Sequence, residues 1–222
     1  ITQIEKGEFN HVPLYLGTVA NETIPFVMGI DVDVKEWMLE LGLDYIFKKA
    51  DAKKIEAVYG PIPKAFNSSK GGMPFFSEIL TDYSFYCPKN HVAGKVAETM
   101  PHVYSYFFDE VPSWSTWYKG AGSPCTKWVC HAFDLPTIFD TVYKMPADFP
   151  RPTPEEDKLS VFVQNAIAQF MKTGDMEGNG WPRYNNETRL LYNLSVPMPT
   201  VPIAKSRQKF CDLWDSVGYG RR

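Results

Sequence analysis

The sequence has no long apolar run and no cluster of basic residues. Its 222 residues include 23 lysines and arginines against 26 aspartates and glutamates, so the formal net charge is −3. No basic run is long enough to follow a phosphate backbone or an anionic bilayer. No segment reaches the roughly 18 consecutive apolar residues that a membrane-spanning helix needs, and residues 1–6 do not form a signal peptide. We therefore expect neither a nucleic-acid partner nor a membrane span, while a signal upstream stays open.

Cysteine is also scarce. The four cysteines, Cys87, Cys125, Cys130 and Cys211, are too few for a disulfide-dense scaffold, and their spacing differs from that of zinc ribbons and fingers. No metal site is therefore expected. An even number of cysteines suits two disulfides in a secreted protein, but four buried thiols in a cytosolic enzyme would give the same count.

Triplets of the form Asn-x-Ser/Thr favour the secreted alternative. They begin at Asn67, Asn186 and Asn193, and the first two lie in polar segments where we expect exposure and glycosylation. A fourth triplet, at Asn21, is expected to be buried. We therefore predict a secreted protein or one of the secretory-pathway lumen.

Apolar residues make up 44% of the sequence and aromatic residues 15%, which is enough for a sizeable core in one domain. Strand-like segments alternate with segments of helical periodicity, which predicts an α/β fold. Strands are expected at residues 12–20, 102–108 and 189–194, and helices at 34–54, 74–88 with an extension to 100, 153–174 and 203–217. No repeat or linker divides residues 1–222, so we expect a single domain.

Five segments, in order along the chain, resemble motifs of one known family. Residues 7–18 are similar to the pattern x-F-N-x-V-P-x-x-x-G-T/V, and residues 19–23 follow as its x-x-D-E-G. Residues 103–108 are similar to Y-x-Y-x-F, and residues 130–139 to x-H-G-x-E/D-L-P-F-V-F. Residues 168–184 are similar to F-A-K-T-G-x-P-N followed by W-P-x-Y. Together these motifs resemble the second half of the type-B carboxylesterase/cholinesterase family.

The resemblance implies the C-terminal portion of an α/β-hydrolase fold, whose catalytic triad runs Ser, Glu or Asp, then His along the chain. It makes Glu22 the catalytic acid and His131 the catalytic histidine. The family's G-x-S-x-G nucleophile elbow is absent: residues 67–71 and 214–218 come nearest, and both lack the first glycine. The Gly-Gly loop of the oxyanion hole is absent as well. The implied partner is therefore the N-terminal half of the same hydrolase domain, which carries the serine.

The chemistry of acyl transfer explains why this pair matters. A serine hydroxyl becomes a good nucleophile when an imidazole takes its proton, and a carboxylate fixes the tautomer of that imidazole and stabilises its cation. The resemblance thus implies a serine carboxylesterase or lipase that hydrolyses small-molecule carboxylic esters without a cofactor. Its activity would require the missing N-terminal half, which supplies the oxyanion donors. Without that half the strand edges stay exposed, so the chain alone should fold poorly.

The alternative is a non-catalytic, cholinesterase-like adhesion or interaction domain that has lost the serine. The joint presence of Glu22 and His131 favours the enzyme, because a binding module needs neither as a pair. The other histidines, His11, His91 and His102, match no catalytic position and are interpreted as structural or exposed.

The same resemblance assigns Phe26, Ala132 and Phe133 to the substrate pocket. Ala132 stands where the family usually has glycine, so its methyl group would shift the loop or narrow the pocket. At Pro25 and Phe26 the cholinesterases carry two pocket-lining aromatics, and the change favours a neutral ester over a quaternary ammonium substrate.

The resemblance also pairs Cys87 with Cys211 in a disulfide. Cys125 and Cys130 have no counterpart in the family, and they could pair with each other or remain thiols. The acyl-chain preference and the oligomeric state do not follow from the sequence.

Overall fold

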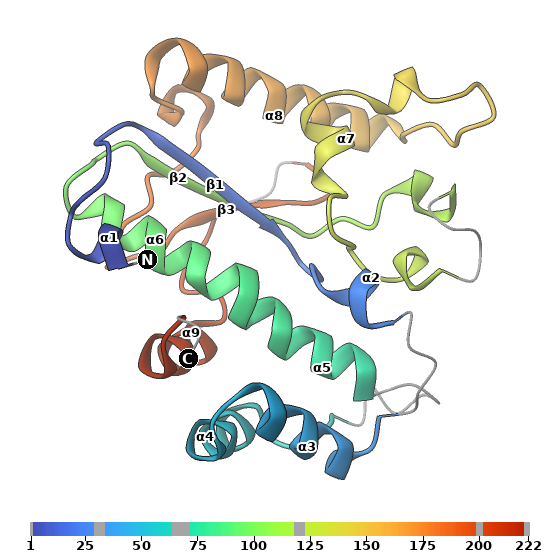
Figure 1. Cartoon of the computed structure of the whole chain (residues 1–222). Helices are drawn as coiled ribbons and strands as arrows, with labels where there is room; N and C mark the ends of the chain where they lie inside the picture. Colours follow the sequence, from blue (N-terminus) through green and yellow to red (C-terminus); the bar gives the residue numbers. More distant parts are fainter. Residues whose placement is uncertain (1, 29–33, 64–71, 118–122, 199–201, 220–222) are drawn as a thin grey trace.

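The computed structural model describes residues 2–28, 34–63, 72–117, 123–198 and 202–219. Asn67, one of the two predicted glycosylation sites, lies outside these residues. The described part forms a four-stranded sheet with helices on both faces, α8 on one face and α5, α6 and α9 on the other (Figure 1). No helix in this described part is both long enough and apolar enough to cross a membrane.

The sheet has the strand order β1-β2-β3-β4. Strands β1 (Leu14–Val19), β2 (Val103–Phe108) and β3 (Leu191–Leu194) are parallel, and the short β4 (Pro202–Ile203) pairs antiparallel with β3. The three predicted strands are thus confirmed. Strand β2 is buried almost throughout, as expected for a strand that has neighbours on both sides and helices on both faces.

Helices α3 (Glu36–Ile46) and α4 (Lys49–Tyr59) replace the single helix predicted at residues 34–54. The break lies at Phe47, whose backbone is extended (φ −115°, ψ 162°). Its ring is buried and packs on Tyr83 and Trp214, with centroid distances of 4.9 and 5.3 Å. Burying this ring therefore outweighs continuing the helix.

A long, continuous helical segment lies on one face of the sheet. It consists of α5 (Gly72–Thr81), a π-helical turn η2 (Asp82–Tyr86) and α6 (Cys87–Ala97). Pro88 lies in the first turn of α6 and has no N–H to donate to the preceding turn. The α-helical hydrogen-bond pattern is interrupted at this point by the π-helical turn η2. The predicted extension of the helix beyond Pro88 is confirmed, and α6 packs against both β1 and β2.

The other face of the sheet is covered by α8 (Pro154–Thr173). A capping box begins this helix: the Thr153 side chain accepts a hydrogen bond from Glu156 N, and the Glu156 side chain accepts one from Thr153 N. Gly174, in the left-handed region at φ 72°, ends it. The predicted helix at residues 153–174 is confirmed, because both of its ends carry strong local signals.

The remaining helices are short. The C-terminal helix α9 begins at Gln208 rather than at the predicted residue 203, because Ile203 pairs with Leu191 in the sheet. Within the described residues, the short helices are α1 (Thr2–Glu5), α2 (Ile24–Val27), η3 (Ser113–Trp117), η4 (Pro124–Thr126), α7 (Asp134–Ile138), η5 (Val142–Lys144), η6 (Glu177–Asn179) and α9 (Gln208–Val217).

Two disulfides join the chain. Cys87 at the start of α6 is bonded to Cys211 in α9, as the family resemblance implied, and the bond spans 124 positions of sequence. Cys125 is bonded to Cys130, only five positions away. This second bond settles the open alternative for these two cysteines in favour of local pairing.

Gly17 allows the side chain of Tyr106 to cross β1, so we predict that Gly17→Ala is destabilising. A Cβ atom at Gly17 would lie 1.8 Å from Tyr106 Cζ, which is far inside van der Waals contact. The ring must move, and we expect the free energy of unfolding to fall by about 1–3 kcal/mol. Denaturant unfolding of the protein that contains this chain measures this change.

Gly42 provides the matched control, because it lies inside α3 and a Cβ there meets only Phe76 at 3.8 Å. Gly42→Ala should raise stability by roughly 0.5–1 kcal/mol through helix propensity. Equal effects of the two substitutions would show that the contact between Gly17 and Tyr106 does not constrain the fold.

Candidate active site

Glu22 lies three residues beyond the end of β1, in the turn that leads into α2. It is only 5% exposed, and its Oε1 atom accepts a hydrogen bond of 2.9 Å from Val19 N. The next residue fixes the turn to α5, since Thr23 Oγ1 lies 2.7 Å from Ser77 O and 3.1 Å from Thr81 Oγ1. The carboxylate is therefore held in place on both sides.

His131 lies on the segment that follows β2, and this segment is tied to the Glu22 turn. Asn21 N donates to Val129 O (3.0 Å), and Val129 N donates to Asn21 Oδ1 (3.1 Å). The disulfide between Cys125 and Cys130 closes the loop just before His131. Asn21, the residue before Glu22, thus pairs with the segment that leads directly into His131.

The structure brings the two predicted catalytic residues together. His131 Nδ1 lies 2.5 Å from Glu22 Oε2, although 109 positions of sequence separate them. The Glu22 side chain is buried, whereas the His131 side chain is 45% exposed. Within the described residues, Nε2 of His131 has no hydrogen-bond partner. An imidazole held by a carboxylate at Nδ1 and open at Nε2 can accept a proton from a hydroxyl group.

Burial raises the pKa of the Glu22 carboxyl group, and the nearby Asp134 raises it further. Hydrogen bonds from His131 and Val19 N, together with the charge of His131, act in the opposite direction. The net shift is upward, so loss of water around the carboxylate outweighs its contacts.

Asp134 adds a second carboxylate next to this pair. It is 8% exposed and accepts a 2.7 Å hydrogen bond from Tyr106 OH. Burial and the charge of Asp134 raise the pKa of Tyr106 well above its ordinary value, so the phenol stays a donor. Neither Asp134 nor Tyr106 is among the site residues predicted from the sequence. Both nevertheless occupy positions of the family motifs, at the E/D of the histidine motif and the second Y of Y-x-Y-x-F.

Of the three predicted substrate-pocket residues, two lie at the surface beside His131. Phe26 is 61% exposed, and its ring centroid lies 5.4 Å from that of His131. Ala132 follows His131 with φ 69°, in the left-handed region that favours glycine, which accounts for the glycine usual at this motif position. Phe133 is 1% exposed and packs on Trp114 with centroids 5.2 Å apart. The structure therefore places Phe133 in the core and not at that surface.

An unpredicted aromatic residue completes this surface. The ring of Phe85, in η2, lies 5.7 Å from that of His131, on another element than Phe26. The other histidines lie elsewhere: His11 contacts Thr99, His91 lies between Glu5 and Asp215, and His102 faces Asp175. Among the described residues, no three His, Cys, Asp or Glu side chains come close enough to hold a metal ion.

A parallel sheet with a carboxylate after one strand and a histidine beyond the next is the arrangement of an α/β-hydrolase. Solved structures agree. The fold matches a structure of PNB esterase with a TM-score of 0.68 at 23% identity, over 96% of this chain and 40% of that one. The likeness shows that the chain has the α/β-hydrolase fold and corresponds to its C-terminal portion.

Sequence comparisons identify the family. Residues 2–214 match the model of the carboxylesterase family. The chain is 28% identical to the crystal protein of Dictyostelium discoideum over 99% of its length, and 29% identical to the para-nitrobenzyl esterase of Bacillus subtilis over 93%. It spans 40% and 39% of those proteins, respectively. The chain therefore belongs to the carboxylesterase family.

We predict that Glu22→Gln makes stability less dependent on pH. Since the pKa of Glu22 is raised in the folded state, the folded protein binds this proton more tightly than the unfolded chain does. The stability contributed by this group is present below its ordinary pKa of about 4.5 and is lost as the pH rises through the raised value. Glutamine at this position should therefore flatten that decline in the free energy of unfolding.

Denaturant unfolding between about pH 4 and pH 8 measures the slope for the parent and the variant. Glu40→Gln, at an exposed position of α3, serves as the control for loss of one surface charge. The prediction is contradicted if Glu22→Gln and Glu40→Gln give the same slope as the parent.

Proposed function

We propose that this chain supplies the acid and the base of a serine carboxylesterase whose nucleophile lies outside it. The observation that supports the proposal best is the contact between His131 Nδ1 and Glu22 Oε2, with Nε2 left open. A structural histidine usually has both nitrogens satisfied or exposed to solvent without such a buried carboxylate. Membership of the carboxylesterase family supports ester hydrolysis at the level of the family.

In the proposed reaction, His131 Nε2 accepts the proton of the serine hydroxyl as the serine oxygen bonds to the carbonyl carbon of the ester. His131 then donates this proton to the departing alcohol as the ester carbon–oxygen bond breaks, which leaves an acyl-enzyme. In the second half, His131 accepts a proton from water as the water oxygen bonds to the acyl carbon. His131 then donates this proton to the serine oxygen as the acyl bond to serine breaks, which releases the carboxylic acid and restores the serine. Glu22 remains ionised and stabilises the imidazolium in each half of the reaction.

The serine and the oxyanion donors would come from an N-terminal portion that pairs with β1. Among the described residues, β1 pairs as a strand with β2 alone, so its other edge is free. A free edge of a parallel sheet needs a neighbour, because its N–H and C=O groups are otherwise unpaired. The chain's coverage of about 40% of its relatives leaves room for such a portion.

The surroundings of His131 favour a neutral ester. Phe26 and Phe85 flank the imidazole with aromatic rings, which suit an apolar acyl or alkyl group. No carboxylate other than Glu22 is hydrogen-bonded to His131 within the described part of the chain.

The two disulfides support a protein that matures in an oxidising compartment and is secreted.

The alternative is a non-catalytic, cholinesterase-like domain. The similarity to a Dictyostelium protein whose name states no reaction is a reason to test this alternative.

A fluorophosphonate probe, which bonds to activated serines, distinguishes the esterase from the non-catalytic domain. In the protein that contains this chain, intact mass should show one probe per molecule. His131→Ala should slow labelling by about a thousandfold or more, because the serine loses its base.

His11→Ala is the control, because His11 is exposed and, among the described residues, its side chain is hydrogen-bonded to Thr99 alone. It should label at the rate of the parent. A protein that carries a serine in a G-x-S-x-G elbow but takes no label would show that the non-catalytic alternative is correct.

The two disulfides should have different effects when each is replaced by a pair of serines. Loss of Cys125–Cys130 loosens the loop beside His131, and a small misplacement of a catalytic group lowers kcat/KM by about 10–100-fold. Loss of Cys87–Cys211 opens a far longer loop, which costs about 5 kcal/mol of stability against about 2 kcal/mol for the short one.

Ester hydrolysis and denaturant unfolding of both double variants measure the two effects side by side. We expect the larger loss of activity from the short loop and the larger loss of stability from the long one. Full activity without Cys125–Cys130 would show that the hydrogen bonds between Asn21 and Val129 suffice to hold His131.

A further inference from the structure

One side of the helical segment α5–η2–α6 contacts the candidate active site. Thr23, which follows the acid in the chain, is held there: Thr23 N donates to Thr81 Oγ1 at 3.2 Å, and Thr23 Oγ1 lies 2.8 Å from Ser77 Oγ. Four positions beyond Thr81, the ring of Phe85 lies 5.7 Å from that of His131. Residues four apart on a helix are neighbours on its surface. Positions 77, 81 and 85 therefore support both predicted catalytic residues from one side of the segment.

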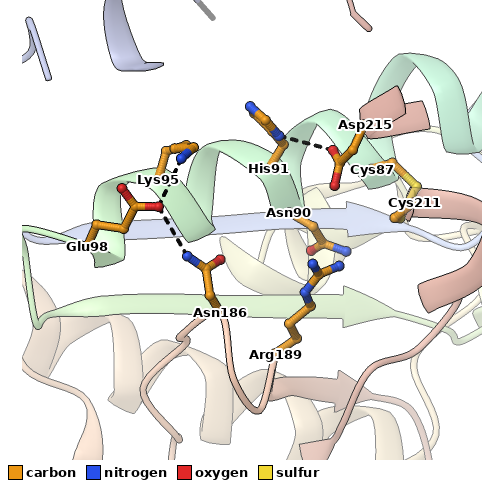
Figure 2. Close-up of a pocket in the computed structure, with 9 residues that line it drawn as sticks. All are labelled: Cys87, Asn90, His91, Lys95, Glu98, Asn186, Arg189, Cys211 and Asp215. Atoms are coloured by element: carbon orange, nitrogen blue, oxygen red, sulfur yellow. Dashed lines mark hydrogen bonds and ion pairs between the residues drawn. A yellow bond between two sulfur atoms is a disulfide. The ribbon is translucent and has the colours of Figure 1, made fainter. Parts of the chain in front are cut away.

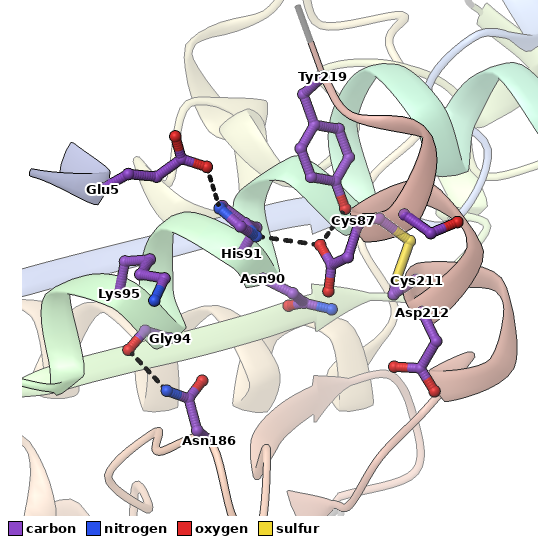
Figure 3. A network of polar contacts seen from close by, with 12 residues as sticks. Glu5, Cys87, Asn90, His91, Gly94, Lys95, Asn186, Cys211, Asp212 and Tyr219 are labelled. Carbon is purple, nitrogen blue, oxygen red and sulfur yellow. Dashed lines mark hydrogen bonds and ion pairs between the residues drawn. A yellow bond between two sulfur atoms is a disulfide. The ribbon is translucent and has the colours of Figure 1, made fainter. Parts of the chain in front are cut away.

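Another side of the segment is joined to α9. Three pairs of side chains make this connection: Arg207 with Asp82, Cys211 with Cys87, and Asp215 with His91. The first pair shares two hydrogen bonds of 2.6 Å, and the second is the long-range disulfide (Figure 2). In the third pair His91 Nδ1 lies 3.0 Å from Asp215 Oδ1, while its Nε2 faces Glu5 of α1 at 3.2 Å (Figure 3). The segment is therefore fixed to α9 along much of its length.

The π-helical turn η2 lets both sides make their contacts. The three residues at α9 are four positions apart, whereas Asp82 and Cys87 are five apart. In an α-helix five positions amount to about 500°, so these two side chains would point roughly 140° away from each other. In η2 the Cys87 N–H bonds to Asp82 O, which takes one more residue into the turn than an α-helix does. Asp82 and Cys87 thus both reach α9, while Phe85 faces His131.

Phe85 is the more firmly held of the two rings beside His131. Phe26 is 61% exposed and lies on the four-residue helix α2, whereas Phe85 is partly buried on the long segment. Within the part of the chain that the structure describes, the imidazole has one hydrogen bond, to Glu22, and the His131 side chain is 45% exposed. One hydrogen bond leaves the imidazole free to turn about it. A ring fixed against the imidazole limits that rotation.

We propose that Phe85 is a positioning residue for His131 and that Arg207 fixes Phe85 through the π-helical turn. This inference rests on the proposed esterase function, in which His131 Nε2 meets the serine hydroxyl in both halves of the reaction. Phe85 keeps Nε2 directed at the serine. Arg207 holds Asp82, the residue that begins the turn. The rate of ester hydrolysis therefore depends on an ion pair that is hydrogen-bonded to neither the acid nor the base.

Phe85→Leu tests the positioning role, because it removes the ring and keeps a large apolar side chain. In the protein that contains this chain, we expect kcat for a neutral ester to fall about 10–100-fold with little change in KM, since a misplaced base affects the transition state more than binding. Phe85→Tyr retains the ring and should keep most of the parent's kcat.

Phe76→Leu is the matched control. Phe76 is partly buried on the same segment, but its ring faces Gly42 of α3, where a Cβ atom would meet it at 3.8 Å. This variant should retain the kcat of the parent. A Phe85→Leu enzyme that loses no more kcat than Phe76→Leu would overturn the positioning role.

Arg207→Lys tests the connection through the turn, because lysine keeps the charge and loses the paired hydrogen bonds to Asp82. We expect kcat to fall about 3–10-fold in the parent. In the Phe85→Leu background the same substitution should leave kcat unchanged, because the ring through which Arg207 acts is already absent. An equal loss of kcat in both backgrounds would show that Arg207 does not act through Phe85.

Nuclear magnetic resonance tests the contact without the reaction. In protein with ¹³C-labelled histidine, the His131 ring signal is identified by its absence from His131→Ala. Phe85→Leu should shift this signal, because a neighbouring aromatic ring alters its magnetic environment, and Arg207→Lys should shift it in the same direction. Phe76→Leu should leave it in place.

The two measurements separate this inference from the proposed function. A parent protein that neither hydrolyses esters nor takes the fluorophosphonate probe would refute the esterase, and the histidine signal would still report whether Phe85 positions the imidazole. A signal that does not move in Phe85→Leu would overturn the inference, even in an active esterase.

Discussion

The pairing of β1 with β2 determines the rest of this structure. Its register runs from Leu14 against Val103 to Val19 against Phe108, so both strands end at the same edge of the sheet. The segments that leave this edge then pair again, Asn21 with Cys130, and bring Glu22 to His131. Because parallel strands direct their carboxyl ends to one edge, the two residues meet although 109 positions separate them.

This arrangement has an electrostatic cost at Glu22. A buried carboxylate loses its hydration, and the upward shift of its pKa records that loss. Burial raises the pKa of Tyr15 and of Tyr106, and the charge of Asp134 raises both further. The phenols therefore remain neutral donors beside the carboxylates. The Glu22 carboxyl group, 2.5 Å from His131 Nδ1, is placed to stabilise the positive charge that forms when a histidine accepts a proton from a nucleophile.

Much of the fold could be predicted from local patterns. The three parallel strands and helix α8 carried clear signals, including the cap at Thr153 and Gly174 at the end of the helix. The break at Phe47 and strand β4 could not be predicted, because both depend on distant partners: Trp214 for the ring of Phe47, and Leu191 for Ile203. The short pairing of Cys125 with Cys130 also had no decisive signal in the sequence, since two thiols would have the same spacing.

In the candidate site, too, some features could be predicted from the sequence and others could not. Glu22 and His131 stand in motifs, so a resemblance could assign them before any contact was known, whereas the hydrogen bond from Tyr106 to Asp134 appears only when β2 and α7 are placed together. Substitution at Gly17 would disturb that bond, because the ring of Tyr106 crosses β1 at this glycine. Strand β1 therefore positions Glu22 and also packs against the Tyr106 ring, whose hydroxyl group donates to Asp134. Among the described residues, the edge of β1 away from β2 has no neighbour. A strand that paired with it would therefore restrain Glu22 and, through Tyr106, also Asp134.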